Sequence, residues 1–258
     1  MQVVILCGGR GTRLSEETQA RPKPMVDIGG RPILWHVMKI YERCGFADFT
    51  LALGYKGELI KDYFLNYHAR QSDLTLSLKS GRRDYHKLPS EDWRVSLIDT
   101  GVNTQTGGRL LRLKQHLGTE GPFMLTYGDG VADVDIGASL DFHRTHGRLA
   151  TVTAVRPSSR FGALQVDEGK VVAFSEKPQS GEGWINGGFF IFEPTIFDYL
   201  KDDNTILERS PLESLAAAGE LMAYQHPGYW QCMDTIRDRD ALRAACEAGL
   251  PPWLKTRQ

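Results

Sequence analysis

A glycine-rich turn with cationic neighbours is the first feature of this sequence that could do chemistry. The apolar run 3–7 leads into GGRGTR at residues 8–13, and Lys23 follows between two prolines. Glycines directly after a buried strand let backbone N–H groups approach an anion, and guanidinium groups in the same turn can bind that anion too. Proline on both sides restricts the backbone of Lys23, which suits a fixed point charge. The stretch therefore predicts a phosphate site.

Two common phosphate-binding fingerprints do not fit this turn. The dinucleotide pattern GxGxxG can start at Gly9, but its last position is Leu14, and the chain has no Gly-Lys-Ser or Gly-Lys-Thr of a P-loop. A tight turn that merely needs glycines is the alternative. The nearby arginines and the restricted Lys23 favour the phosphate interpretation.

A carboxylate follows a second apolar run. Asp129 lies between two glycines just after the predicted strand in 122–130. Ligands of open α/β sheets bind at the carboxyl ends of strands, and Mg²⁺ prefers oxygen donors shared with substrate phosphates. Asp129 is thus a candidate metal ligand, and an ordinary Asp-Gly turn residue is the alternative.

Predicted strands and helices, which must position these residues, alternate along the first 150 residues. Apolar runs predict buried strands in 3–7, 48–55, 122–130 and 149–155, and helical spacing predicts helices in 31–45, 56–69 and 136–147. Such alternation predicts a parallel sheet wrapped by helices. Beyond residue 150, strands in 162–167, 170–178 and 183–194 are separated by short turns, which favours antiparallel pairing before a final helix in 238–249.

Composition and charge restrict the class of protein. The 258 residues are 41% hydrophobic and 24% charged, with a net charge of −1, so no overall field favours nucleic acid or an anionic membrane. No apolar run approaches the roughly 20 residues of a membrane span. The four cysteines are scattered without a CxxC pair, which predicts reduced thiols in a cytoplasmic protein.

Longer motifs carry a resemblance to a known family. "GGRGTRL" followed by "RPKPM" closely resembles the opening signature of the sugar-1-phosphate nucleotidylyltransferases. "DTGVNTQTGGRLLRL", "YGDGVADVDI", "INGGFFIF" and "GELMAYQHPGYWQCMDTIRD" resemble its branch that acts on CTP and glucose 1-phosphate.

The resemblance implies an α/β, Rossmann-like nucleotidyltransferase fold, with a mixed, mostly parallel central sheet wrapped by helices and a small antiparallel sheet region in the second half. It implies one domain over 1–258, in which 1–150 mainly binds nucleotide and 151–258 mainly binds sugar. The implied reaction is Mg²⁺-dependent transfer of a cytidylyl group from CTP to glucose 1-phosphate, giving CDP-glucose and pyrophosphate. UTP or dTTP in place of CTP stays open, and the family suggests a homo-oligomer.

The family's site residues can be carried onto matching positions. The metal ligands are Asp129 and Asp234, although Asp234 could instead cap the helix after it. Arg13 and Lys23 neutralise charge on the transferring and leaving phosphates, so the implied catalytic residues are Arg13, Lys23 and Asp129. The implied nucleotide-binding residues are Leu6, Gly8, Gly9, Gly11, Thr12, Arg13, Lys23, Thr106, Gly107, Gly108, Arg109 and Gly128.

Three of these positions carry a more specific expectation. Gly107 and Gly108 would let backbone groups meet the pyrimidine edge. Arg109 either contacts the ligand or stands in the first turn of a solvated helix.

The sugar phosphate is assigned to the second half in the same way. By resemblance, Lys177 holds the attacking phosphate and Glu176 accepts hydrogen bonds from sugar hydroxyls. The alternative is that this pair is simply exposed to solvent, as Glu-Lys pairs on strands often are. The implied sugar-phosphate-binding residues are Gly162, Glu176, Lys177, Asn186 and Gly187. The stretch "TILERSPL" around Glu208 departs from the family's usual residues.

A glycosyltransferase is the rival function. Asp133 and Asp135 form an Asp-x-Asp motif, which glycosyltransferases of related fold use to hold a metal and a nucleotide-sugar diphosphate. Those transferases lack the opening glycine-rich turn. We therefore expect the two aspartates to serve the turn and the start of the next helix.

Overall fold

A seven-stranded sheet forms the centre of the molecule. In this computed structural model, residues 1–118, 120–157, 163–167, 170–175 and 183–255 are described. The strand order is β14-β10-β13-β8-β1-β4-β7, and the bounds are β1 Gln2–Leu6, β4 Asp48–Leu53, β7 Arg94–Asp99, β8 Phe123–Tyr127, β10 Ala150–Val155, β13 Ile185–Phe192 and β14 Leu221–His226. Within it, β13 alone runs antiparallel to its neighbours β8 and β10. The predicted mixed, mostly parallel sheet is confirmed.

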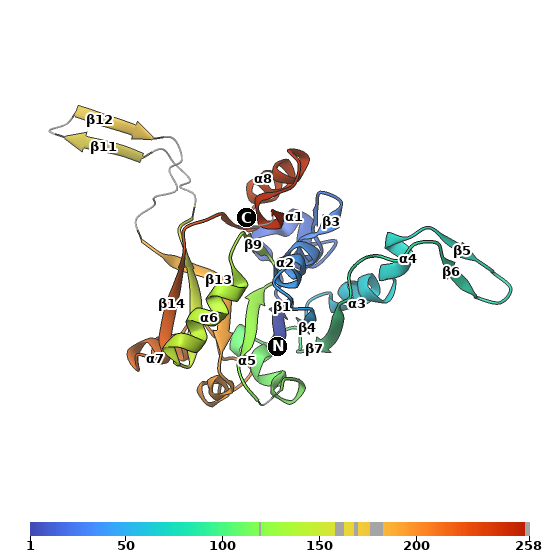
Figure 1. The fold of residues 1–258 in the computed structure, drawn as a ribbon, viewed down its shortest axis with the longest axis horizontal. Coiled ribbons are helices and arrows are strands. Elements are labelled where there is room, and N and C mark those ends of the chain that lie inside the picture. Colours follow the sequence, from blue (N-terminus) through green and yellow to red (C-terminus); the bar gives the residue numbers. More distant parts are fainter. Residues whose placement is uncertain (119, 158–162, 168–169, 176–182, 256–258) are drawn as a thin grey trace.

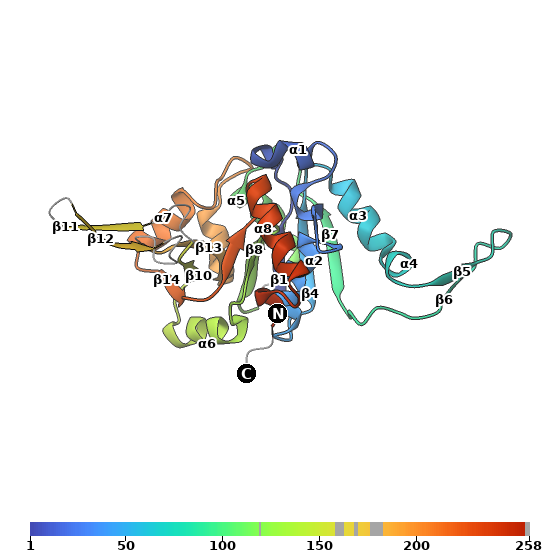
Figure 2. The same ribbon diagram turned by 90° about the horizontal axis from the view of Figure 1, so that it is seen from above.

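Helices cover both faces of this sheet (Figures 1 and 2). The α-helices are α1 Ser15–Thr18, α2 Ile33–Glu42, α3 Gly57–Leu65, α4 Tyr67–Gln71, α5 Thr106–Arg112, α6 Ile136–His146, α7 Ser210–Ala217 and α8 Ile236–Glu247. The predicted helices in 31–45, 56–69, 136–147 and 238–249 are present, the second of them divided into α3 and α4. No described helix is long and apolar enough to cross a bilayer.

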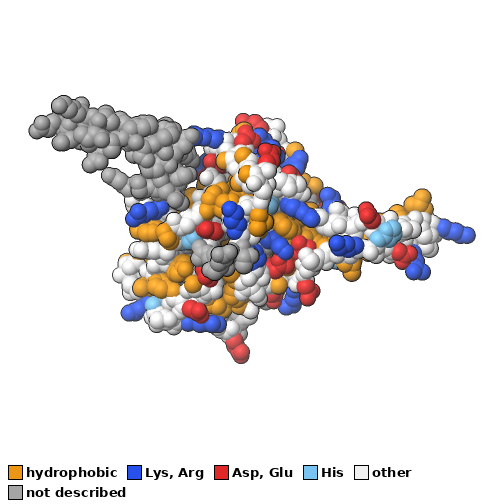
Figure 3. All heavy atoms as spheres, turned by 45° about the horizontal axis from the view of Figure 1, so that its top comes forward, with side chains coloured by type: hydrophobic (Ala, Val, Ile, Leu, Met, Phe, Trp, Pro, Cys, Tyr) orange, Lys and Arg blue, Asp and Glu red, His pale blue; other side chains and the backbone are white. Residues whose placement is uncertain are grey.

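Smaller antiparallel pairs complete the chain. They are β2 Asp27–Ile28 with β3 Arg31–Pro32, β5 Leu74–Leu76 with β6 Arg83–Tyr85, β9 Gly130–Ala132 with β15 Trp230–Cys232, and β11 Ala163–Asp167 with β12 Lys170–Ser175. The antiparallel pairing expected after residue 150 is thus found in β11–β12 and around β13. The pair β5–β6 stands away from the sheet as an arm, with basic side chains at its tip (Figures 1 and 3).

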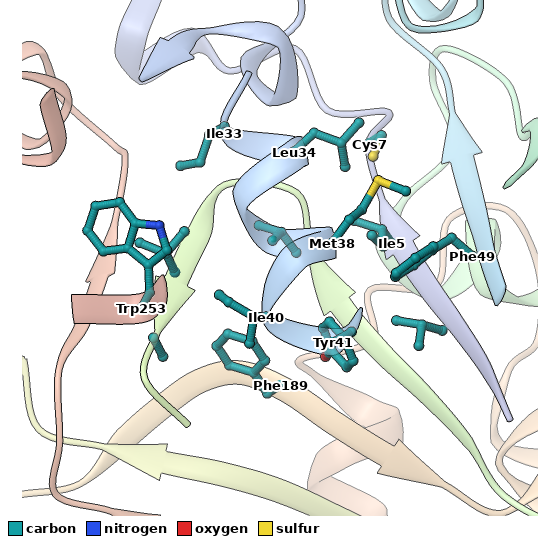
Figure 4. Packing of buried hydrophobic residues seen from close by; sticks show 14 of the residues in the cluster. Ile5, Cys7, Ile33, Leu34, Met38, Ile40, Tyr41, Phe49, Phe189 and Trp253 are labelled. Atoms are coloured by element: carbon teal, nitrogen blue, oxygen red, sulfur yellow. The ribbon is translucent and has the colours of Figure 1, made fainter. Parts of the chain in front are cut away.

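Two cores lie on opposite faces of the sheet. Alternate residues of β1 point to each side: Val3 and Ile5 face α2, whereas Val4 and Leu6 face α5 and α7. Figure 4 shows the larger core, in which side chains of α2 pack over β1, β4 and β13. Burial of β1 on both faces explains why residues 3–7 are apolar without alternation.

A buried histidine connects the larger core to the C-terminal region. The carbonyl of Ile28 lies 2.8 Å from His36 Nε2, and the indole N–H of Trp253 donates to His36 Nδ1 at 3.1 Å. The imidazole therefore carries its proton on Nε2 and accepts at Nδ1. Burial lowers the pKa of His36 because the charged form would lose its hydration.

This arrangement predicts a pH-dependent stability. Since the pKa of His36 is lower in the folded state than in the unfolded state, the unfolded chain takes up the proton first as the pH falls below about 6.5. The pKa values of His143 and His146 are also lowered by burial, with the same sign. We expect the melting temperature to fall as the pH is lowered from about 7 to about 5. His36→Gln should weaken this dependence, whereas exposed His116→Gln should preserve it. A melting temperature that stays flat over this range would contradict the assignment.

Candidate active site

A cleft opens at the carboxyl ends of β1 and β8. Its volume is about 340 Å³. It is lined by the residues that follow the two strands, by the glycine-rich turn and by the start of α5: Leu6, Cys7, Gly8, Gly9, Gly11, Thr12, Arg13, Lys23, Pro24, Thr104, Gln105, Thr106, Arg109, Tyr127, Gly128 and Asp129. The structure thus brings most of the predicted nucleotide-binding residues to one cavity. Gly107 and Gly108 are not among its lining residues.

Lys23 projects into this cleft from a constrained segment. It begins the 3₁₀-helix η2 Lys23–Met25, after Pro22 in an extended conformation. Its side chain is 10% exposed. The ammonium donates to Asp129 Oδ2 and to Asp234 Oδ1, each at 2.7 Å. The prolines therefore hold a buried cation between two carboxylates.

A short ribbon brings the two carboxylates together. The strand β9 pairs with β15, and the N–H of Met233 donates to the carbonyl of Asp129 at 2.9 Å, so Asp129 just before β9 and Asp234 just after β15 lie near each other. The cap of α8 is Thr235, whose hydroxyl accepts from the N–H of Asp238. The alternative that Asp234 is the N-cap is therefore wrong, and its carboxylate pairs with Lys23 and Arg13.

Electrostatics favour the charged forms of Asp234 and Lys23. Burial alone would raise the pKa of Asp234, but hydrogen bonds and charge from Lys23 and Arg13 hold that pKa below its usual range. Burial alone would lower the pKa of Lys23, but Asp129 and Asp234 hold it above its usual range. Arg13 Nη1 lies 2.6 Å from Asp234 Oδ2, and its side chain is 74% exposed. This exposed cation lies at the outer side of Asp234 and lines the cleft.

Arg109 is buried behind the turn rather than solvated. Its guanidinium donates to carbonyl groups at the ends of three neighbouring strands: Gly8 after β1 (2.9 Å), Leu53 of β4 (3.0 Å) and Gly101 after β7 (2.7 Å). It also donates to the hydroxyl of Thr100 at 2.8 Å. The solvated-helix alternative is wrong. Arg109 lines the cleft, and its guanidinium donates to the strand ends and loops that shape it.

Gly8 is required by that guanidinium. A Cβ at Gly8 would lie 2.0 Å from Arg109 Nη1, so no side chain fits between them. Gly11 has φ +62°, a conformation that favours glycine. The glycines of the turn therefore have packing reasons in addition to leaving backbone open to the cleft.

Gly107 and Gly108 face another loop. A Cβ at Gly107 would lie 2.8 Å from Thr205 Cγ2, and one at Gly108 would lie 2.5 Å from the carbonyl oxygen of Asp203. The N–H of Gly108 already donates to the carbonyl of Thr205 at 3.1 Å. The structure thus places these glycines at the contact between α5 and residues 203–205, where we expected backbone open to a base.

A smaller cavity of about 50 Å³ adjoins the cleft. Asn186 and Gly187 of β13 line it together with Trp230 and Cys232, and the indole N–H of Trp230 donates to the carbonyl of Gly187 at 2.7 Å. Because β13 is antiparallel, its first residues lie at the edge where its parallel neighbours end. Gly162, Glu176 and Lys177 lie outside the described residues.

Sequence reasoning missed two further residues of this region. Tyr127 lines both cavities, and its hydroxyl donates to the carboxylate of Glu208. Position alone could have suggested Tyr127, since it precedes Gly128 and Asp129 at the end of a buried strand. Glu208 gave no signal, because its partners are distant in sequence.

Comparison with known proteins places the chain in a family. Residues 2–236 match the nucleotidyl transferase family, so the chain belongs to that family. A glucose-1-phosphate cytidylyltransferase of Salmonella typhi is 51% identical over 253 residues, covering 98% of both chains. A Bacillus subtilis relative named "Probable glucose-1-phosphate cytidylyltransferase" is 47% identical over 254 residues, covering 98% of this chain and 99% of the relative. The crystal structure of HddC from Yersinia pseudotuberculosis, 24% identical, shares the fold with a TM-score of 0.69 over 94% of this chain and 98% of that one.

The buried guanidinium gives a test of how the cleft is shaped. Arg109→Lys keeps the charge, but one ammonium cannot reach the ends of β1, β4 and β7 at once. Buried carbonyl groups left without donors should lower the free energy of unfolding by roughly 1–3 kcal/mol. Chemical denaturation measures this loss. Arg112→Lys is the control on the same helix, since Arg112 pairs with Asp203 at the surface. An Arg109→Lys variant as stable as Arg112→Lys would refute the assigned role.

Proposed function

We propose that this chain transfers a cytidylyl group from CTP to α-D-glucose 1-phosphate, giving CDP-glucose and pyrophosphate. The observation that carries the proposal is the buried ammonium of Lys23 between Asp129 and Asp234, at the mouth of a glycine-lined cleft. Relatives named for this activity at 51% identity over nearly the whole chain support the choice of substrates. The first half of the chain would mainly bind the nucleotide and the second half the sugar.

The two cavities suggest where the substrates lie. The triphosphate would occupy the larger cleft, with its phosphates on the glycine-rich turn and its base beside Thr106 and the start of α5. The sugar would lie toward Asn186 and Gly187, with Glu176 and Lys177 as its further contacts. Asp129 lines both cavities, so the reacting phosphates would meet beside it.

The reaction needs positioning and charge neutralisation rather than a base. An oxygen of glucose 1-phosphate is already anionic at neutral pH, so it can attack the α-phosphate of CTP without losing a proton. The new P–O bond forms as the bond to pyrophosphate breaks. Lys23 and Arg13 would balance the charge that grows on the transferring and leaving phosphates.

The donor set fits a divalent cation. Oxygens of Asp129 and Asp234 converge on one point, now held by the Lys23 ammonium 2.7 Å from each. No cluster of three or more acidic, histidine or cysteine ligands occurs among the described residues. Mg²⁺ commonly takes only one or two carboxylates and completes its shell with water and substrate phosphates. Asp129 and Asp234 would hold Mg²⁺, which would supply Lewis-acid stabilisation of the phosphate charge.

The rival glycosyltransferase function receives no support from Asp133 and Asp135. Asp135 caps α6 by accepting from the N–H of Ala138 at 2.8 Å, as expected for a helix start. Asp133 Oδ1 lies 2.8 Å from His226 Nε2, and neither aspartate lines the cleft or the smaller cavity.

The cysteines bear on the compartment of the protein. All four are free thiols, and we propose a reducing compartment, the cytoplasm.

The exposed apolar side chains of the arm bear on assembly. Leu76 and Leu78 are exposed, the latter by 89%. We propose that the protein forms a homo-oligomer.

Release of pyrophosphate tests the reaction directly. With Mg²⁺ and glucose 1-phosphate, we expect turnover with CTP to exceed turnover with UTP or dTTP. Asp129→Asn and Asp234→Asn should each lower the rate about 100-fold or more, because each keeps the shape but removes a charge that the cation needs. Background release with every triphosphate would refute the nucleotidyl transfer. Near-normal rates in both variants would refute the metal assignment.

Loss of the Lys23 side chain should strengthen metal binding but lower turnover. Because its ammonium occupies the point where the two carboxylates converge, Lys23→Ala should bind Mn²⁺ more tightly in the absence of nucleotide, by roughly tenfold for the loss of competing charge-assisted bonds. Turnover should fall, since charge on the transferring phosphate loses its partner. Calorimetric titration with Mn²⁺ measures the affinity. Lys201→Ala, on the surface, serves as the control. Equal or weaker Mn²⁺ binding by Lys23→Ala would contradict the competition.

A further inference from the structure

Tyr127 separates the two cavities of the proposed site. It is the last residue of β8, and it lines the larger cleft and the smaller cavity. Gly188 has φ +81°, and a Cβ there would lie 2.6 Å from Tyr127 Cδ2, so the ring packs directly on the backbone of β13. Phe190 meets the same ring edge-on, with centroids 6.1 Å apart. Packing thus fixes the plane of this ring.

The hydroxyl of Tyr127 donates to Glu208 Oε1, and the side-chain amide of Asn186 lies beside that hydroxyl. The carbonyl of the amide accepts from the N–H of Gly188 at 2.8 Å, which fixes its orientation. Glu208 therefore fixes the Tyr127 hydroxyl next to Asn186, a residue of the smaller cavity.

The other oxygen of Glu208 reaches the nucleotide side. The hydroxyl of Thr106 donates to Glu208 Oε2 at 2.6 Å and accepts from the N–H of Leu207 at 2.9 Å. Thr106 begins α5 and lines the larger cleft. One carboxylate thus fixes a residue of each cavity, although Glu208 itself lines neither.

Only a carboxylate satisfies this set of partners. Thr106 and Tyr127 both present O–H donors, and a carboxylate is an acceptor at both oxygens. A glutamine of the same size has one acceptor and one donor group, so it can keep one of the two bonds. The hydrogen bonds to an ionised acceptor are also the stronger kind.

We propose that Glu208 and Tyr127 are a positioning pair that sets the wall between the nucleotide cleft and the sugar-side cavity. Glu208 fixes Thr106 on one side and the Tyr127 hydroxyl beside Asn186 on the other, so that the two substrates meet in one geometry. This inference rests on the proposed function. Both residues act by placing others, and neither takes part in the bond changes.

Steady-state kinetics of isosteric variants tests the pair. In Tyr127→Phe the ring and its packing remain, but the hydroxyl that Glu208 holds beside Asn186 is lost, so the KM for glucose 1-phosphate should rise several-fold, with a smaller change in the KM for CTP. In Glu208→Gln one of the two bonds is lost, so kcat should fall roughly tenfold or more. Arg209→Gln, at the exposed neighbouring position, should behave as the wild type. Melting temperatures of all variants should stay close to that of the wild type.

The double variant separates positioning from a general loss of stability. Because both changes interrupt one chain of hydrogen bonds, the loss in kcat/KM of Tyr127→Phe/Glu208→Gln should be smaller than the product of the single losses. Wild-type kinetics in both single variants, or losses that simply multiply, would overturn the inference. Calorimetric binding of CTP alone gives a readout that does not need turnover, and Glu208→Gln should weaken it. An inactive wild type would count against the proposed function, whereas an active wild type with unaffected variants would count against the positioning pair alone.

Discussion

The pairing of one buried ammonium with two carboxylates is the constraint around which the site is built. Lys23, Asp129 and Asp234 come from distant parts of the chain, and none of these charges is stable in a poorly hydrated place without the others. The turn before η2, the ribbon of β9 and β15 and the start of α8 must therefore meet at one point. Under the proposed function, a divalent cation would replace the ammonium beside the two carboxylates, and a substrate phosphate would replace the carboxylates beside the ammonium.

A second buried cation shapes the surroundings of the first. The planar guanidinium of Arg109 donates to carbonyl groups at the ends of three adjacent strands, and a single ammonium could not reach all three at once. It thereby fixes the loops after β1 and β7 against one another. The two cations differ in role: Arg109 supports the loops around the cleft, whereas Lys23 projects into the cleft.

Much of this fold could be predicted from the sequence because its central elements are buried on both faces. Strands such as β1, β4 and β8 are short apolar runs, and helix α2 has an apolar stripe that packs over them. By contrast, β7 lies at the edge of the sheet and β14 at the other edge, and their mixed residues give no such signal. The restricted mount of Lys23 was visible because proline acts locally on the backbone.

The contacts of the site were less predictable, and the reason is physical. Arg109 was expected either to touch a ligand or to lie in solvent, whereas its donors meet carbonyl groups up to 101 residues away. Likewise, the glycines at 107 and 108 were expected to open the backbone to a base, but they admit a loop from beyond residue 200. The roles of such side chains and glycines depend on tertiary contacts, and no local sequence pattern encodes these contacts.

The arm formed by β5 and β6 shows how the chemistry is insulated from the periphery. The chain enters the arm after α4 and leaves it before β7. The pairing of β4 with β7 involves no residue of the arm. A change in the length of the arm would therefore leave the loops that face the cleft in place. The periphery of the molecule can be remodelled independently of the sheet edge that carries the site.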